Sequence, residues 1–241
     1  MTAAKRFVIL SGPACAGKGP LQAALARFYP ELVQARPVLC HSRPPGSSDV
    51  HGKTFYFLPP ALIKSLESNP DFVVSKVRSD WQAIDLIQVE DLLRSNDLVF
   101  AEVFHTFGPG LRKRATSRGF ETIGVFLFPL PPETPAETII QTMRARLTSR
   151  GRDSATKTNE RAESAPIEMN DAHAYAHRLL NLAGEDNVEE WGEFGMSQGN
   201  PGNRTIKSLD DLGPNAKWLV ETFVKICRGE LASGDHSRLS A

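Results

Sequence analysis

The chain has 241 residues and equal numbers of basic and acidic side chains, 28 of each, so its formal net charge is zero. Its length suits one α/β domain with a substantial core. Because the whole surface carries no excess charge, we expect neither nucleic acid nor an anionic membrane as a partner. Three widely spaced cysteines favour a reducing compartment. No apolar run approaches the roughly 20 residues of a membrane helix, and we expect a cytoplasmic location.

The first predicted elements are a strand, a glycine-rich loop and a helix. Arg6–Ser11 carries four apolar residues in succession, which is typical of a strand covered on both faces. The range 21–28 has alanine and leucine at helical spacing, and Pro20 fits the first turn of a helix, where N–H groups are free. Apolar runs predict two more short strands, at 38–40 and 54–58.

Strands and helices continue to alternate through the middle of the chain. The apolar runs at 98–103 (LVFAEV) and 123–128 (IGVFLF) are typical of strands in a buried parallel sheet. The other expected elements are helices at 60–68, 89–94 and 134–149 and a strand at 72–77. This alternation predicts an α/β fold of three layers around a parallel core sheet.

The last third of the chain is less regular. The arginine-rich range 150–165 predicts a mobile segment that leads into another helix. The range 179–182 predicts the last strand of the sheet, and 194–203 (FGMSQGNPGN) predicts a loop. Apolar residues at helical spacing over 215–227 predict a closing helix, after which we expect a frayed C-terminus.

The stretch 11-SGPACAGKGPL-21 follows the phosphate-loop motif G-x-x-x-x-G-K-[ST] up to its last position. Gly12, Gly17 and Lys18 are in register, but Gly19 stands where a hydroxyl would bind magnesium, and Pro20 follows it. The preceding strand and the following helix are the context that the motif requires. We therefore expect the loop to hold the phosphates of ATP through Gly12, Ala14, Cys15, Ala16, Gly17, Lys18 and Gly19.

Two further motifs follow the phosphate loop, at 41–57 and 146–168. In the first, 41-HSRPPGSSDVHGKTFYF-57, Arg43, Pro45, Gly52 and Phe57 are in register with the pattern T-T-R-x-P-R-x-G-E-x-x-G-x-x-Y-x-F, and the stretch thereby resembles the monophosphate-binding segment of the guanylate kinase family. Downstream, the family's R-L-x-x-R-G stretch and the following R-x(6)-E are matched by Arg146, Leu147, Arg150, Gly151, Arg161 and Glu168. The three motifs occur in the family's order and span about 7–181.

The resemblance implies a single phosphate-loop kinase domain that uses ATP and Mg²⁺ and acts on a small phosphate-bearing acceptor, such as a nucleotide. It divides the chain into a core (about 5–34 and 96–230), an acceptor-binding segment (about 35–95) and an arginine-rich lid (about 148–165). The catalytic residues it implies are Lys18, Arg146, Arg150 and Arg161, which neutralise phosphate charge. The acceptor-binding residues it implies are Arg43, Asp49, Phe55, Val74 and Glu102.

The acceptor-binding positions depart from the family pattern. The family's second phosphate arginine corresponds to Gly46, its guanine-contacting glutamate to the shorter Asp49, and a phosphate-contacting tyrosine to Phe55. Its second guanine-reading glutamate corresponds to Val74. Each unmade contact with a base edge costs about 1–3 kcal/mol, so we expect poor selectivity for GMP.

The phosphate loop departs as well. Adenylate kinases, which share this loop, read G-K-G-T here, so Gly19 is compatible with magnesium held through water and the nucleotide phosphates. Pro20 removes the remaining hydroxyl and one backbone N–H, which predicts weaker donor binding. The alternative interpretation is therefore a catalytically impaired binding module. Lys18 and the lid arginines favour the enzyme, because a peptide-binding module needs no donor site. We expect a monomer or homodimer.

Two features concern metal ions directly. Glu102, at the end of the apolar run LVFAE, either orients water around magnesium or forms a structural ion pair. His173 and His177 are spaced like metal ligands on a helix, but no third ligand accompanies them. We therefore expect no site in which protein side chains alone hold a metal.

Overall fold

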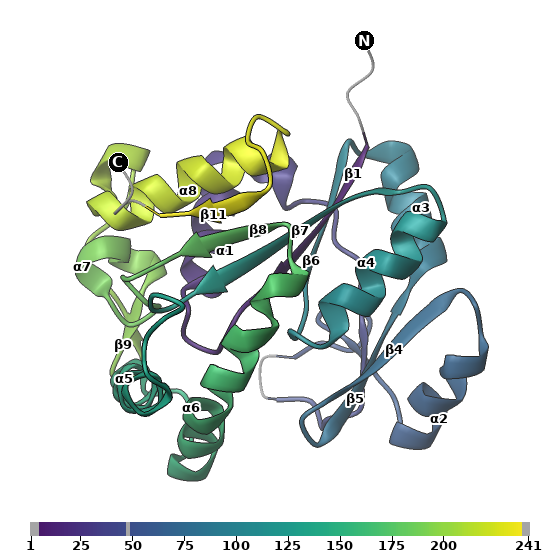
Figure 1. Ribbon diagram of the computed structural model, residues 1–241, viewed down its shortest axis with the longest axis horizontal. Coiled ribbons are helices and arrows are strands. Elements are labelled where there is room, and N and C mark those ends of the chain that lie inside the picture. Colours follow the sequence, from purple (N-terminus) through teal and green to yellow (C-terminus); the bar gives the residue numbers. More distant parts are fainter. Residues whose placement is uncertain (1–4, 47–48, 238–241) are drawn as a thin grey trace.

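The computed structural model describes residues 5–46 and 49–237 (Figure 1). Its centre is a five-stranded sheet in the order β11-β8-β7-β1-β6, and every neighbouring pair in it is parallel. In chain order these strands are β1 (Arg6–Ser11), β6 (Leu98–Glu102), β7 (Glu121–Phe128), β8 (His177–Leu180) and β11 (Gly234–His236). The predicted parallel core sheet is confirmed.

Helices cover both faces of this sheet. Alternate residues of β1 point to opposite faces, with Phe7 and Ile9 in one buried cluster and Val8 and Leu10 in the other. The first face is covered by α3 (Leu86–Ser95), α4 (Phe107–Ser117), α5 (Ala136–Arg150) and α6 (Ala155–Asn170). The second is covered by α1 (Lys18–Phe28), α7 (Val188–Trp191) and α8 (Pro214–Cys227). The three-layer prediction is thereby confirmed.

A second, four-stranded sheet lies at the lower right of Figure 1, in the order β3-β2-β5-β4. Its strands are β2 (Cys40–His41), β3 (Tyr56–Phe57), β4 (Phe72–Val77) and β5 (Asp80–Asp85). The helix α2 (Pro60–Ser65) packs on it through buried Ile63, which joins Cys40 and Ala83 in a small apolar cluster. Short 3₁₀ turns occur at Pro30–Leu32, Leu66–Ser68, Asp171–Ala174, Gly192–Phe194 and Leu209–Asp211.

Two elements in the middle of the chain escape prediction from the sequence. The strand β5 lies in the weakly patterned stretch RSDWQAI, and pairing with β4 gives it its regular form. The helix α4 begins with Phe107, Gly108, Pro109 and Gly110, which as a group predict a turn. Gly108 is needed there for space, because a Cβ atom on it would lie 2.1 Å from the Tyr175 hydroxyl.

Three predictions for the last third of the chain are corrected. Most of the predicted mobile segment 150–165 is helix, because α6 starts at Ala155 and is capped by the Ser154 side chain. The predicted loop 194–203 contains a small hairpin of β9 (Met196–Ser197) and β10 (Asn200–Pro201). The C-terminus expected to fray forms β11, while 238–241 lie outside the described residues.

His177 lies on β8 instead of a helix, and it contacts His236 of the edge strand β11. Its Nδ1 lies 3.2 Å from Nε2 of His236, and the rings stack with centroids 5.5 Å apart. Burial and the neighbouring ring lower the pKa of His177 below its ordinary value. Burial also lowers the pKa of His236, where Asp235 and Arg178 have opposing effects. The contact between the two rings is therefore most stable when both imidazoles are neutral.

We expect β11 to loosen as the pH falls through the range below 6.5, the ordinary histidine value. The folded state binds fewer protons than the unfolded chain there, so the stabilisation is present at higher pH and is lost on acidification. Hydrogen-exchange protection of Gly234–His236 should be nearly constant above about pH 7 and should fall progressively as the pH is lowered below about 6.5. His236→Asn should remove most of this pH dependence, and an unchanged dependence would contradict the role of the pair.

Candidate active site

A cavity of about 610 Å³ lies where the phosphate loop, the end of β6, the second sheet and the start of the α5–α6 connection meet. Its wall contains six basic side chains, Lys18, Arg36, Arg78, Arg150, Arg152 and Arg161, and three acidic ones, Glu102, Glu168 and Glu185. The chain as a whole is neutral, so this positive charge is a local concentration. Such a cavity favours an anionic ligand.

The phosphate loop runs from the end of β1 into the first turn of α1. Gly17 caps that helix with φ near +93°, a backbone conformation that favours glycine. The buried Asn181 side chain donates to the Ala16 carbonyl at 2.8 Å, and a Cβ on Gly17 would lie 2.1 Å from its Nδ2 atom. The loop is therefore held from behind by the residue that follows β8, and its open side faces the cavity.

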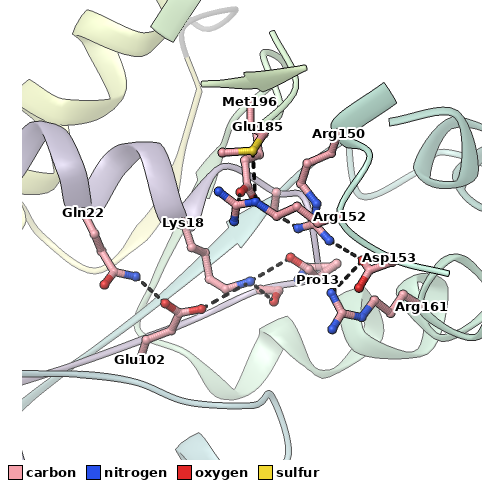
Figure 2. A network of polar contacts seen from close by, with 12 residues as sticks. Pro13, Lys18, Gln22, Glu102, Arg150, Arg152, Asp153, Arg161, Glu185 and Met196 are labelled. Carbon is pink, nitrogen blue, oxygen red and sulfur yellow. Dashed lines mark hydrogen bonds and ion pairs between the residues drawn. The ribbon is translucent and has the colours of Figure 1, made fainter. Parts of the chain in front are cut away.

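Lys18 lies at the mouth of the loop (Figure 2). Its Nζ atom donates to the carbonyls of Gly12 at 2.6 Å and Pro13 at 2.8 Å. It also lies 3.9 Å from the carboxylate of Glu102, which accepts a hydrogen bond from Gln22. These contacts hold the ammonium group beside the loop, where it can exchange carbonyl oxygens for phosphate oxygens.

Three arginines of the predicted lid line the cavity and share two carboxylates (Figure 2). Arg150 pairs with Asp153 and, through Nη1 at 3.1 Å, with Glu185. Asp153 also accepts from Arg161 at 3.0 Å, and Glu185 pairs with Arg152 at 3.1 Å. Burial alone would lower the pKa of Arg150, but attraction by Glu185 and Asp153 raises it, so the group stays charged.

Arg146, predicted to act on the phosphates, lies outside the cavity wall in this structure. Its guanidinium donates to the carbonyls of Pro129 at 3.1 Å and Leu182 at 2.7 Å. Burial lowers its pKa, and the charge of Asp186 acts against that shift. Arg146 therefore joins the chain after β7 to the chain after β8, and it supports the cavity from behind.

The predicted acceptor residues separate into two groups. Phe55 and Glu102 line the cavity, whereas Arg43 and Asp49 lie outside its wall. Arg43 Nη1 donates to Asp49 at 2.5 Å, and its guanidinium lies 5.3 Å from the ring centres of Phe55 and Phe57. The hydrogen bonds from Arg43 and the Gly46 N–H lower the pKa of Asp49. Arg43 thus lies beside Phe55, a residue of the cavity wall.

Val74, predicted at an acceptor-binding position, lies outside the wall of this cavity. Val74 pairs with Ala83 across β4 and β5 and packs against the apolar cluster under α2. The cavity is lined from this sheet by Val77 and Gln82, and Val77 is three residues further along the strand. Because side chains alternate between the two faces of a strand, Val74 and Val77 point to opposite sides.

Sequence reasoning missed several cavity residues. Arg78 occupies the turn between β4 and β5 with φ near +56°, pairs with Glu168 at 3.1 Å and lies 4.8 Å from the Phe104 ring centre. Glu168 belongs to a matched motif, and because its buried carboxylate requires a basic partner, the structure pairs it with Arg78. Other missed residues include Arg36, Gln82, Arg152 and Glu185, which carry no motif of their own.

Within residues 5–46 and 49–237, no group of three or more His, Cys, Asp or Glu side chains could hold a metal ion. Gly19 and Pro20 offer no hydroxyl at the loop. Glu102 does fit a magnesium ion held through water, since its carboxylate is 41% exposed and lies beside Lys18. Over the same residues, no helix has the length and hydropathy to cross a membrane.

The parallel sheet, the glycine-rich loop before α1 and the arginines that face it define a phosphate-loop protein of kinase architecture. Curated proteins that are similar to this chain in sequence are named guanylate kinase. One from Nostoc sp. is 27% identical over 177 residues, which cover 73% of this chain and 82% of the relative. One from Clostridium perfringens is 26% identical over 185 residues, which cover 76% of this chain and 77% of the relative.

A solved structure supports the same assignment of fold. The crystal structure of guanylate kinase from Anaplasma phagocytophilum aligns with a TM-score of 0.58 and 13% identity, covering 95% of this chain and 88% of that one. A scan against models of protein families finds no match. The similarities confirm the resemblance to guanylate kinases that the three motifs predict: the relatives are similar in sequence over about three quarters of this chain, and the solved structure shares its fold.

Proposed function

We propose that the protein transfers a phosphoryl group from ATP to a small phosphate-bearing acceptor, a nucleoside monophosphate or a similar compound. The observation that carries this proposal is one cavity lined by Lys18 of the phosphate loop, by the lid arginines and by Thr54 and Phe55 of the acceptor segment. Phosphoryl transfer depends on alignment and charge neutralisation, and the cavity offers both. The names of the curated relatives support the same reaction.

The donor end is the phosphate loop. Its backbone N–H groups and the positive end of α1 would hold the phosphates. Lys18 would leave the carbonyls of Gly12 and Pro13 and stabilise charge on the transferred group. Arg150 and Arg161 would neutralise the phosphates and help to exclude water that would hydrolyse ATP. Magnesium, when bound, supplies further charge neutralisation, with Glu102 as the residue that would hold it through water.

The acceptor end is formed by the second sheet, and we propose only weak selectivity for GMP. The edge of guanine presents the N1–H and an amino group, which require acceptors. Each carboxylate in the cavity wall is paired with a cation, Glu102 with Lys18, Glu168 with Arg78 and Glu185 with Arg150. Gln82, whose amide is buried in the wall, offers a carbonyl oxygen as acceptor and an NH₂ group as donor. Such a wall discriminates weakly between bases.

A substrate panel tests this function. The protein is incubated with ATP and Mg²⁺ and with each of several nucleoside monophosphates and sugar phosphates, and ADP release is measured against a reaction without acceptor. We expect at least one phosphate-bearing acceptor to raise ADP release well above that background. ATP binding without any acceptor-dependent turnover would favour the alternative, an impaired binding module, for which Pro20 is the supporting observation.

We expect Arg43→Ala and Arg78→Ala to raise the acceptor KM at least tenfold and to change the ATP KM less than twofold. Arg78 already lines the cavity, and Arg43 would reach the acceptor phosphate by exchanging its bond to Asp49. A tenfold change corresponds to about 1.4 kcal/mol, which is ordinary for one charged hydrogen bond. Initial rates at varied acceptor and ATP concentrations separate the two constants. A rise with Arg78→Ala alone would exclude Arg43 from acceptor binding.

A further inference from the structure

The carboxylate of Glu185 lies directly over the first turn of α1. Its two oxygens and Cδ come within 3.4–3.9 Å of the position that a Cβ atom on Gly19 would occupy. The backbone fixes it there, because the Glu185 N–H donates to the Cys15 carbonyl at 3.2 Å and its carbonyl accepts from the Met196 N–H at 2.9 Å. The side chain is only 9% exposed.

The same carboxylate holds two lid arginines. Oε2 lies 3.1 Å from Nη1 of Arg150, and Oε1 lies 3.1 Å from Nη1 of Arg152 (Figure 2). The group is therefore surrounded by the positive end of a helix on one side and by two guanidinium groups on the other. This is the environment in which the phosphate loop is expected to hold a donor phosphate.

We propose that Glu185 is an internal substitute for a phosphate group. In the free protein it occupies the space beside Gly19 and holds Arg150 and Arg152 over the loop. When a polyphosphate chain enters, the arginines exchange the carboxylate for phosphate oxygens, and the repulsion between Glu185 and the phosphates lowers donor affinity. Glu185 is thus a positioning residue that sets the donor affinity. This inference rests on the proposed function only in taking the loop to be a phosphate site.

Position 19 lies beside this carboxylate. A Cβ there would lie 3.4 Å from Oε1 of Glu185, which is ordinary van der Waals contact. A serine at this position would bring its hydroxyl next to the carboxylate, to which a hydroxyl donates a hydrogen bond.

The test measures binding of two probes, ATP and inorganic tripolyphosphate, by calorimetry to the wild type and to Glu185→Gln. The amide has the shape of the carboxylate but lacks its charge. We expect both probes to bind about tenfold more tightly to the variant, a change equivalent to about 1.4 kcal/mol. The ATP KM should fall by a similar factor.

Asp153→Asn is the matched control. Asp153 pairs with the same Arg150, its side chain is equally buried, and it does not line the cavity. If Glu185 acts only by restraining the lid, both variants should change affinity alike. If Glu185 occupies the phosphate position, only Glu185→Gln should tighten binding. Should Glu185→Gln fail to fold, Glu185→Asp replaces it, with the carboxylate withdrawn by one methylene and an expected tightening of about threefold.

The outcomes separate this inference from the proposed function. If the wild type binds ATP and the Glu185 variant binds it equally or more weakly, the inference is overturned and the proposed function stands. If tripolyphosphate binding tightens in the variant while neither protein turns over ATP with any acceptor, the inference stands and the proposed function fails. If no protein binds either probe, both are overturned.

Discussion

Lys18→Ala is expected to lower kcat/KM at least a hundredfold. The Lys18 ammonium group is the basic group closest to the phosphate loop, hydrogen-bonded to the carbonyls of Gly12 and Pro13. In the reaction it would stabilise charge that develops on the transferred phosphoryl group, and loss of one such preorganised group costs about 2.7–4 kcal/mol. Each 1.36 kcal/mol corresponds to about a factor of ten in rate.

The measurement is steady-state turnover with ATP and the best acceptor of the panel. Lys113→Ala provides the control, because that lysine is exposed on α4 away from the cavity and should leave kcat/KM unchanged. Lys18→Ala should retain the thermal unfolding temperature of the wild type within a few degrees, since its amine contacts two loop carbonyls and, at 3.9 Å, the partly exposed Glu102 carboxylate. Unchanged turnover in a folded Lys18→Ala protein would show that the loop is not the donor site.

The parts of the site that could be predicted are those whose geometry is local. The phosphate loop is set by a few consecutive residues between a strand and a helix, so its pattern carries its shape. The same holds for the buried strands β1 and β7, whose apolar runs require cover on both faces. The three-layer fold follows from such runs and the helices between them.

Other parts depend on pairings that the sequence does not contain. The side of the sheet that Val74 faces is set by the register of β4 on β5, and a shift by one residue would reverse it. Glu185 meets Arg150 across 35 positions of the chain, and Arg78 meets Glu168 across 90. Arg146 matches its motif and nevertheless binds backbone carbonyls behind the cavity. A motif thus fixes where a residue stands in the chain, and packing decides what its side chain contacts.

Arg150→Ala is expected to affect both stability and turnover. Arg150 is 5% exposed and pairs with two carboxylates that are each 9% exposed, Asp153 and Glu185. Removing one partner of a buried ion pair costs about 3–5 kcal/mol, because it leaves buried charge uncompensated. Arg161 and Arg152 remain beside the two carboxylates, so we expect the lower end, about 3 kcal/mol. For a chain of this length that lowers Tm by roughly 6–12 °C.

Arg152→Ala is the matched comparison, since Arg152 pairs with the same Glu185 but its side chain is 50% exposed. Solvent screens that pair, so its loss should cost less than about 1 kcal/mol. Thermal unfolding followed by circular dichroism measures both variants. Equal Tm values for Arg150→Ala and Arg152→Ala would contradict the importance of burial in this cluster.

Turnover distinguishes the role of Arg150 in the reaction from its role in stability. It is measured at least about 15 °C below the Tm of the variant, where the folded form dominates. We expect kcat to fall about a hundredfold, because one guanidinium that would neutralise transferred phosphate charge is gone. Arg150→Lys retains a charge but cannot bridge Asp153 and Glu185 as the planar fork does. It should therefore recover part of the stability and little of the turnover. Full recovery of kcat in Arg150→Lys would mean that a positive charge at this position is sufficient for turnover and that the bridging guanidinium is not needed.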